Sequence, residues 1–335
     1  MPAGSVASCG HRFSEGWQIP QSFCQKGDEA FMNTNSLARA RAKSTTIAAT
    51  VFLLPALLLI VIFMIYPVID TFVTSTYKWN GISADKIFVG FDNWKTLFKD
   101  MNFWNSFIHN VIVMIFSILL QIPIGLLLAT FLDAGGRKFN FFKIVWFLPY
   151  LMSSVAIAFL FNYILATNGG LFSSIATLFS GHKVNVDLLG KSPSALFAVI
   201  GVMAWQFTPF YMVYFIAGYG NIDTSLYEAA VIDGATKWQK IRYIDIPLLL
   251  PTAMILLILR SGSTLSVGFE KVFLLQNQLN LNVSEVISTY VYKMGLVNSQ
   301  YSLSTAISLF NTVINLVVLL GVNKLSKKLT ETSLL

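Results

Sequence analysis

The chain has 335 residues, of which 55% are hydrophobic and only 12% are charged, and its formal net charge is +7. A soluble domain carries about 25% charged residues. This composition, with a mean hydropathy of +0.65, therefore excludes an ordinary soluble domain and indicates an integral membrane protein. The positive charge does not indicate nucleic-acid binding, because no basic patch alternates with aromatic residues on a soluble face.

Residues 1–31 differ in composition from the rest of the chain. They are rich in Gly and Ser and show no hydrophobic periodicity. Both cysteines, Cys9 and Cys24, lie here, and their spacing fits no zinc pattern even with His11 nearby. We expect this stretch to be disordered or a gene-call extension ahead of a natural start at Met32, and residues 1–45 to form an N-terminal cytoplasmic segment.

Six apolar runs follow, each long enough to cross a bilayer. A hydrocarbon core of ~30 Å requires about 20 helical residues at ~1.5 Å each. The runs are 47–69, 107–132, 144–165, 195–217, 248–269 and 303–322. Arg260 and several Ser and Thr residues interrupt the fifth run. The sequence therefore predicts an all-α integral membrane protein with six transmembrane helices.

Basic residues on the short loops predict the orientation of the spans, because Lys and Arg collect on the cytoplasmic side. They precede the first span, follow the second, separate the fourth from the fifth and follow the sixth: Arg39, Arg41, Lys43, Arg137, Lys138, Lys143, Lys237, Lys240, Arg242, Lys324, Lys327 and Lys328. These positions all fall on one side of the membrane. We expect that side, with both chain termini, to be the cytoplasm.

Two outer segments are long for simple connections. Residues 70–106 contain an amphipathic stretch rich in Trp and Phe, "VGFDNWKTLFKDMNFWNSF". It could form an aromatic belt at the membrane interface or a docking surface for an external partner. Residues 270–301 are expected to carry a short helix near 283–296.

A polar module, "LYEAAVIDGATKWQKIRYIDIPLLLP" (Leu226–Pro251), separates the fourth and fifth spans. Ser225 with Glu228, and Thr236 with Gln239, match the capping box that begins a helix. We expect two short helices, 226–233 and 237–243, joined at Gly234, because Gly tolerates the left-handed backbone that ends a helix. Pro247 is expected to begin the next span.

The residue types of this module suit contact with another protein, although a capped connector on the membrane surface is an equal alternative. Small residues allow a close backbone approach, and carboxylates accept hydrogen bonds from a basic or amide partner. The small residues are Ala229, Ala230, Gly234 and Ala235, and the carboxylates are Glu228 and Asp233.

At these residues the chain resembles the membrane permease subunits of binding-protein-dependent ABC importers. "EAAVIDGA" followed by "IPLLLP" matches the family signature at Glu228, Ala229, Ala230, Asp233, Gly234, Ala235, Pro247 and Pro251. Leu250 replaces a residue that is often basic in the family, and Val111 replaces a commoner Thr. The segments "GFDNWKTLFKDMNFWNSFIHN", "ILLILRSGSTLSVGFEKVFLL" and "NKLSKKLTETSLL" are similar to the branch that takes up complex saccharides, as in maltose-type permeases. The resemblance covers about residues 45–335.

The resemblance implies a type I importer fold in which the module is a coupling helix seated on a cytoplasmic ATPase. Glu228 would anchor the ATPase, Ala229 and Ala230 would form the close-packed face, and Gly234 would form the turn. The implied domains are 46–106 (first span and outer loop), 107–323 (permease core with a coupling hairpin at 225–247) and 324–335 (cytoplasmic tail). The implied partners are a second permease subunit, two ATPase subunits, an extracellular solute-binding protein and membrane lipid, in a bacterial cytoplasmic membrane. The chain has no Walker A motif, so ATP and Mg²⁺ would be used by the partner ATPase, and we expect no cofactor on this chain.

Polar residues inside the spans are candidates for the substrate path, since such residues usually face a cavity or one another. Arg260 lies about a dozen residues into the fifth predicted span, followed by Ser263. Aromatic faces, amides and guanidiniums bind sugars, which makes the remaining candidates chemically suitable: Trp205, Gln206, Tyr211, Asn311 and Asn315. Packing and interhelical hydrogen bonds are the alternative explanation for each of them.

The sequence shows no catalytic constellation and no metal-ligand cluster. The predicted function is a non-enzymatic permease subunit for a carbohydrate, with an oligosaccharide favoured by the resemblance. A glycerol phosphate ester is an alternative substrate, because Arg260 would suit an anion. A membrane scaffold with a docking hairpin and an ion-driven secondary transporter are the alternatives from other classes.

Overall fold

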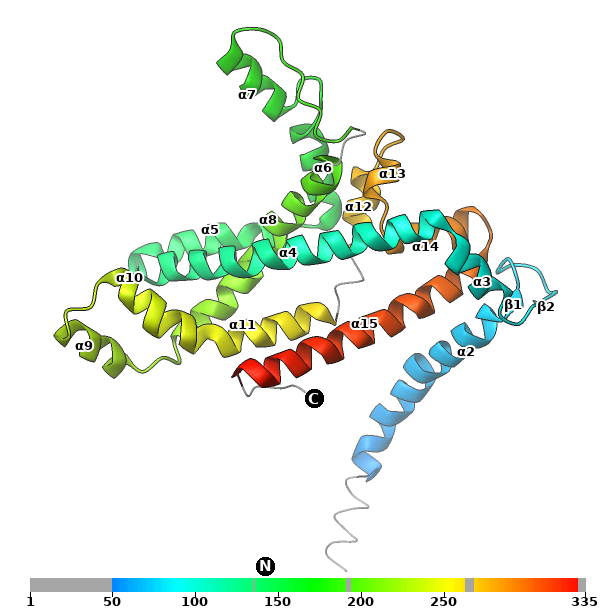
Figure 1. Ribbon diagram of the computed structural model, residues 1–335, viewed down its shortest axis with the longest axis horizontal. Coiled ribbons are helices and arrows are strands. Elements are labelled where there is room, and N and C mark those ends of the chain that lie inside the picture. Colours follow the sequence, from blue (N-terminus) through cyan, green and yellow to red (C-terminus); the bar gives the residue numbers. More distant parts are fainter. Residues whose placement is uncertain (1–49, 135, 191–193, 263–267, 331–335) are drawn as a thin grey trace, which may run out of the picture. The chain divides into compact units, whose positions relative to one another are not determined.

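The computed structural model describes residues 50–134, 136–190, 194–262 and 268–330, so the predictions for residues 1–49, Ser263 and the last five residues lie outside the described part. The chain divides into two compact units, Met1–Asp70 and Thr71–Leu335. Within the described ranges, the non-helical secondary structure is one antiparallel pair of two-residue strands, β1 (Tyr77–Lys78) and β2 (Ile87–Phe88) (Figure 1). The prediction of an all-helical protein is confirmed, with this short hairpin as an addition.

The first helix, Thr50–Ser75, contains all of the described part of the first unit. It includes the π-helical turn η1 (Val61–Ile65) and ends as α2 (Tyr66–Ser75). Every residue from 50 to 70 is exposed within this chain, although nearly all are apolar. Such a surface suits lipid tails, which solvate apolar side chains from all directions.

Five continuous helices in the described ranges are long and apolar enough to span a membrane, and a bent pair supplies a sixth. After Thr50–Ser75, the continuous ones are α4 (Met101–Ala134), α8 (Ser194–Tyr219), the helix Lys237–Ser261 and α15 (Tyr301–Thr330). The bent pair is α5 (Asn140–Leu151) and α6 (Ser154–Ile164). The six runs predicted from hydrophobicity are therefore confirmed in number and order.

The third span, predicted as one helix over about 144–165, is broken into two helices in the structure. The chain bends by 96° between α5 and α6. Pro149 lies in the last turn of α5, Met152 is extended (ψ 144°), and the Ser153 hydroxyl accepts the Val155 amide at 3.3 Å to begin α6. Because both halves are apolar, hydrophobicity alone does not reveal the break between them. Pro149 and the N-cap residue Ser153 create that break together.

The fifth span was predicted at 248–269, but the helix runs over Lys237–Ser261. It consists of α10 (Lys237–Lys240), the π-helical turn η3 (Ile241–Asp245) and α11 (Ile246–Ser261) without interruption. Pro247 has no amide hydrogen and its ring crowds the preceding turn. The wider π turn, in which the Ile246 amide reaches back to the Ile241 carbonyl, accommodates it, so the helix continues through Pro247 instead of beginning there.

A π-helical turn also precedes Pro67, where the Tyr66 amide donates to the Val61 carbonyl across η1.

The shorter elements of the second unit connect the spans: α3 (Asp92–Lys99), η2 (Gly136–Phe139), α7 (Leu171–Ser180), α9 (Thr224–Ile232), α12 (Phe269–Leu275), α13 (Leu281–Ser284), α14 (Ile287–Tyr292) and η4 (Lys293–Val297). The short helix expected near 283–296 is present as α14.

The helices α4 and α8 form the most extensive pairing in the second unit, and α11 lies alongside α15 (Figure 1). A glycine allows the α4–α8 approach, because a Cβ on Gly125 would stand 2.7 Å from the Tyr211 Cβ and 3.3 Å from the Met212 amide nitrogen. Around this crossing lies one buried cluster, which includes Ala129, Leu132, Tyr211, Met212, Phe215, Leu249 and Leu256.

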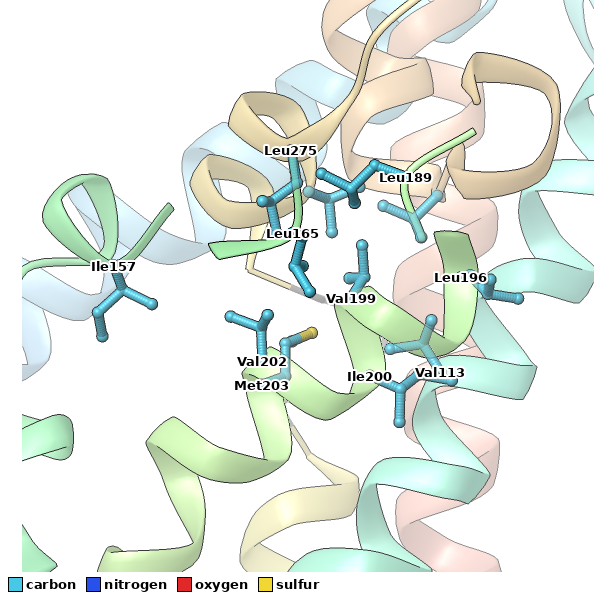
Figure 2. Packing of buried hydrophobic residues seen from close by; sticks show 12 residues of the cluster. Val113, Ile157, Leu165, Leu189, Leu196, Val199, Ile200, Val202, Met203 and Leu275 are labelled. Atoms are coloured by element: carbon cyan, nitrogen blue, oxygen red, sulfur yellow. The ribbon is translucent and has the colours of Figure 1, made fainter. Parts of the chain in front are cut away.

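A second buried cluster joins the first half of α8 to α4, α6 and α12 (Figure 2). Val199, Val202 and Met203 of α8 belong to it together with Leu165 and Leu275. Its members come from segments that are far apart in the sequence, so it fixes α12 against the spans.

The aromatic segment predicted within residues 70–106 packs largely inward. Phe98, Phe103, Trp104 and Phe107 all make ring contacts with Phe310 of α15, with centroid separations of 5.3–6.2 Å. All four pairs are edge-to-face, an arrangement that stabilises them beyond the area that they bury. Packing against the sixth span thus accounts for these rings, while exposed residues such as Ile87 and Phe88 remain available to lipid or a partner.

Candidate functional site

The polar module between the fourth and fifth spans begins at an N-cap that differs from the predicted one. The Asp223 carboxylate accepts the Ser225 amide at 2.9 Å, and α9 starts at Thr224. The hydrogen bond from Ser225 holds the pKa of Asp223 below its usual range, so the cap is ionised and formed at neutral pH. The predicted Ser225–Glu228 capping box is wrong, because the N-cap is Asp223, two residues before Ser225, and its carboxylate accepts the Ser225 amide.

The end of α9 is a Schellman motif centred on Gly234. Gly234 has a left-handed backbone (φ 72°), its amide donates to the Val231 carbonyl at 3.1 Å, and the Ala235 amide donates to the Ala230 carbonyl at 2.9 Å. Apart from its two chain neighbours, no described residue has an atom within 4 Å of a Cβ built on Gly234. The glycine is thus required by backbone conformation, as predicted for the turn, and the space around it is open.

The second predicted capping box is confirmed. The Thr236 hydroxyl accepts the Gln239 amide at 3.3 Å, and the Gln239 side chain accepts the Thr236 amide at 2.7 Å. The helix that begins here does not end near residue 243, as expected, but continues as the fifth span. The module is therefore one short helix, α9, and a sharp turn that leads directly into a membrane-spanning helix.

The surface of this module, which we call the docking hairpin (residues 223–245), combines charge with exposed apolar side chains. No residue of α9 is buried within this chain. Glu228, Ala229, Asp233 and Gly234 are exposed, and Ala230 and Ala235 are half-buried. Val231, Ile232, Trp238 and Tyr243 are exposed to between 62% and 86%. Exposed apolar groups of this size, clustered and rimmed by charges, are typical of a protein interaction site.

One hydrogen bond joins the docking hairpin to the start of the fifth span. The Tyr227 hydroxyl, on α9, donates to Asp245 Oδ1 at 2.6 Å, and Asp245 is only 5% exposed. Burial raises the pKa of Tyr227, and the Asp245 carboxylate raises it further, so the phenol keeps the proton that it donates. A displacement of α9 is thereby linked to the helix that crosses the membrane.

Three of the predicted substrate-path residues lie on α8 and have different surroundings. Trp205 is 38% exposed and meets Phe161 edge-to-face at 5.3 Å. The Gln206 Nε2 donates to the Met152 carbonyl at 3.2 Å, at the bend of the third span. Tyr211 is buried against Gly125 of α4. Gln206 and Tyr211 therefore make contacts within this chain, whereas Trp205 is partly exposed.

Arg260 was expected near the middle of the fifth span, and the structure places it in the last turn of α11 instead. A basic residue there complements the helix dipole. Its guanidinium carbon lies 5.2 Å from the ring centroid of Phe207, which is near the midpoint of α8. Arg260 therefore ends one helix and contacts the middle of another, α8.

The two asparagines of the sixth span lie one turn apart on α15. Asn315 Nδ2 donates to the Gly262 carbonyl at 3.3 Å, beside the end of α11. This contact is the interhelical hydrogen bond that was the alternative explanation for this residue. Asn311 is half-buried on the preceding turn.

Residues 121–331 match the family described as the binding-protein-dependent transport system inner membrane component. The chain belongs to this family. It is a membrane permease subunit with the type I importer fold, as the resemblance of the "EAAVIDGA" module implied.

Similar proteins agree with this assignment. The permease is 31% identical to the polygalacturonan/rhamnogalacturonan transport system permease protein YteP of Bacillus subtilis over 72% of its own length and 76% of that protein. It is 30% identical to the trehalose/maltose transport system permease protein MalF of Thermococcus litoralis, covering 78% and 88% of the two chains. A chain of a bacterial alginate ABC transporter, solved in complex with an alginate pentasaccharide-bound periplasmic protein, superposes with a TM-score of 0.77 at 29% identity, over 87% of the permease and 98% of that chain.

Sequence reasoning missed two features of the permease. One is the Tyr227–Asp245 bond, which depends on the fold-back of α9 and has no signal in local periodicity. The other is Lys271, which is only 3% exposed. Its place in the apolar stretch "KVFLL" was an available signal, because a Lys flanked by buried residues must bury its stem.

Proposed function

We propose that this permease translocates an oligosaccharide across the membrane by alternating access, together with a second permease subunit, two ATPase subunits and a solute-binding protein. The observation that carries the proposal is the docking hairpin: an unburied helix with charged and apolar residues, hydrogen-bonded to a membrane-spanning helix. Such a helix can transmit a displacement imposed from outside the membrane. The similarity to permeases for polygalacturonan and for trehalose and maltose supports a saccharide as the substrate.

ATP and Mg²⁺ are bound in this proposal by the partner ATPases. Glu228 and Asp233 accept hydrogen bonds from the ATPase, and the small residues Ala229, Ala230 and Ala235 allow its close approach. The exposed Trp238 and Tyr243 provide apolar contact area of the kind that dominates interface energies. The permease itself carries out no chemical step.

In this proposal the docking hairpin and both termini are cytoplasmic, an orientation that the basic residues of the short loops support. Lys237, Lys240 and Arg242 of the hairpin and Lys327 and Lys328 of α15 carry this assignment. Reporter fusions at the C-terminus test it. A fluorescent protein should be active there and alkaline phosphatase should not; the reverse pattern would contradict the orientation.

Reconstitution of the four kinds of subunit in vesicles tests the coupling role. Glu228→Lys should abolish most ATP-driven uptake because it places a cation where an acceptor for a basic or amide group is needed, whereas Glu228→Gln should retain it. Full uptake by an assembled Glu228→Lys complex would contradict the coupling role. Uptake that is driven by an ion gradient without ATP would favour a secondary transporter instead.

A further inference from the structure

Two cationic side chains share one aromatic ring at the middle of α8. Lys271 Nζ lies 4.0 Å from the Phe207 ring centroid, and the Arg260 guanidinium carbon lies 5.2 Å from it. The cations come from different elements, α12 and the last turn of α11. A second aromatic residue, Tyr150 of α5, stands edge-to-face to Phe207 at 6.1 Å.

Burial makes Lys271 an unusual side chain. Only 3% of its surface is exposed. It lies on α12, where the neighbouring Val272 and Leu275 belong to the apolar cluster of Figure 2. A buried ammonium normally pairs with a carboxylate, because desolvation is expensive. In the described ranges, ion pairs are formed by Lys95 with Asp92 and by Lys293 with Glu285, and none is formed by Lys271.

The charged groups around Lys271 do not balance it. Glu270, the preceding residue, is exposed and makes no ion pair with it in the described structure. Arg260 adds a second positive charge on the same ring. The aromatic face compensates for part of the desolvation through a cation–π contact, but an anion would stabilise this arrangement far more. Such an anion must come from outside the described chain.

We propose that Lys271, with Arg260 and the face of Phe207, binds a carboxylate of an acidic oligosaccharide during its passage through the permease. The proposal rests on the proposed function and narrows its substrate class from saccharides in general to those that contain uronic acid residues. A carboxylate can accept charge-assisted hydrogen bonds from both cations, and a sugar ring can pack its C–H groups on the aromatic face. Two similar proteins have substrates of this class, because polygalacturonan is a uronic acid polymer and alginate is an acidic polysaccharide.

Trigalacturonate and its fully methyl-esterified form are matched probes, because they share one sugar chain and differ in charge. ATP-driven uptake of each is measured in vesicles that contain the complete transporter, and the ratio of the two uptake rates is compared between variants. Any preference of the binding protein affects both variants equally and cancels. Lys271→Met should lower trigalacturonate uptake at least about tenfold, as expected for one lost charge-assisted hydrogen bond, while uptake of the ester changes less than about threefold.

Methionine suits the test because it keeps the length of the buried stem and removes the charge. Lys271→Arg should retain most of the uptake of the acid, and Lys183→Met, which removes an exposed lysine, should change neither rate. If Lys271→Met lowers the uptake of both probes to the same extent, the inference is overturned. That result would show that the cation stabilises the fold or contacts the second permease. The inference would also be overturned if the transporter takes up a glycerol phosphodiester but does not take up trigalacturonate. If wild-type vesicles take up no saccharide with ATP, the proposed function itself fails.

Discussion

The phenol of Tyr227 and the buried carboxylate of Asp245 meet across 2.6 Å, and this contact joins α9 to the beginning of the fifth span. The two residues are 18 positions apart and lie on opposite sides of the Gly234 turn. Because the helix from Lys237 to Ser261 is continuous, a force on the docking hairpin reaches the membrane core through a helix and one charge-assisted hydrogen bond.

Tyr227→Phe should uncouple the hairpin from the span. The variant leaves the Asp245 carboxylate without this donor, and a hydrogen bond to a charged group contributes about 1.5–3 kcal/mol. We expect lower thermal stability and less substrate taken up per ATP hydrolysed. Tyr243→Phe is the matched control, because Tyr243 lies in the same hairpin and is 75% exposed. Equal coupling ratios in the two variants would show that the bond only supports the fold.

The Gly234 turn should tolerate asparagine but not alanine. Gly234→Ala forces a side chain into a left-handed backbone, at a cost of about 1–2 kcal/mol. Asparagine visits that conformation more readily, and the space around the site is open in this chain. Hydrogen exchange of the α9 amides should therefore be faster in Gly234→Ala than in Gly234→Asn. If both variants also lose binding of the ATPase equally, then contact with a partner, rather than the backbone, is what requires glycine there.

The number of spans and the turn of the docking hairpin could be predicted from sequence because they depend on local signals. Hydrophobic length identified six spans, and Gly234 and the Thr236–Gln239 box marked the turn. The boundaries were less accurate where two local signals compete. Pro247 reads as a helix start, yet the π turn before it keeps the helix intact, and Asp223 outcompetes Ser225 as the N-cap.

The polar residues of the membrane core could not be assigned from sequence, because their roles depend on what lies across from them. Gln206 was a candidate sugar ligand by residue type, but its amide bonds the carbonyl at a bend that hydrophobicity did not reveal. Lys271 was overlooked because α12 lies outside the predicted spans. Its contact with Phe207 joins positions 64 residues apart, a relationship that no periodicity encodes.

Gln206→Met should affect the bend of the third span more than substrate affinity. The substitution removes the donor to the Met152 carbonyl, and it also removes Oε1, a buried acceptor without a partner in the described residues. These effects offset each other, so the free energy of unfolding should change by about 1 kcal/mol or less. The KM for uptake should stay within about twofold of wild type. A tenfold rise in KM at unchanged thermal stability would instead make Gln206 a substrate ligand.

Gly125→Ala should destabilise the permease through the α4–α8 crossing. An added Cβ would stand 2.7 Å from the Tyr211 Cβ and 3.3 Å from the Met212 backbone nitrogen, so neither neighbour can yield by rotating a flexible side chain. Overpacking of this kind typically costs about 1–3 kcal/mol, which should appear as a lower melting temperature in detergent.

Gly201→Ala is the control for this prediction, because Gly201 lies on α8 and, beyond its own helix backbone and chain neighbours, no described atom is within 4 Å of its built Cβ. The higher helix propensity of alanine should leave that variant as stable as wild type or slightly more stable. Equal melting temperatures for Gly125→Ala and wild type would show that α4 and α8 can separate without loss. In that case the crossing at Tyr211 would be adjustable, and close packing at Gly125 would not be what holds α4 and α8 together.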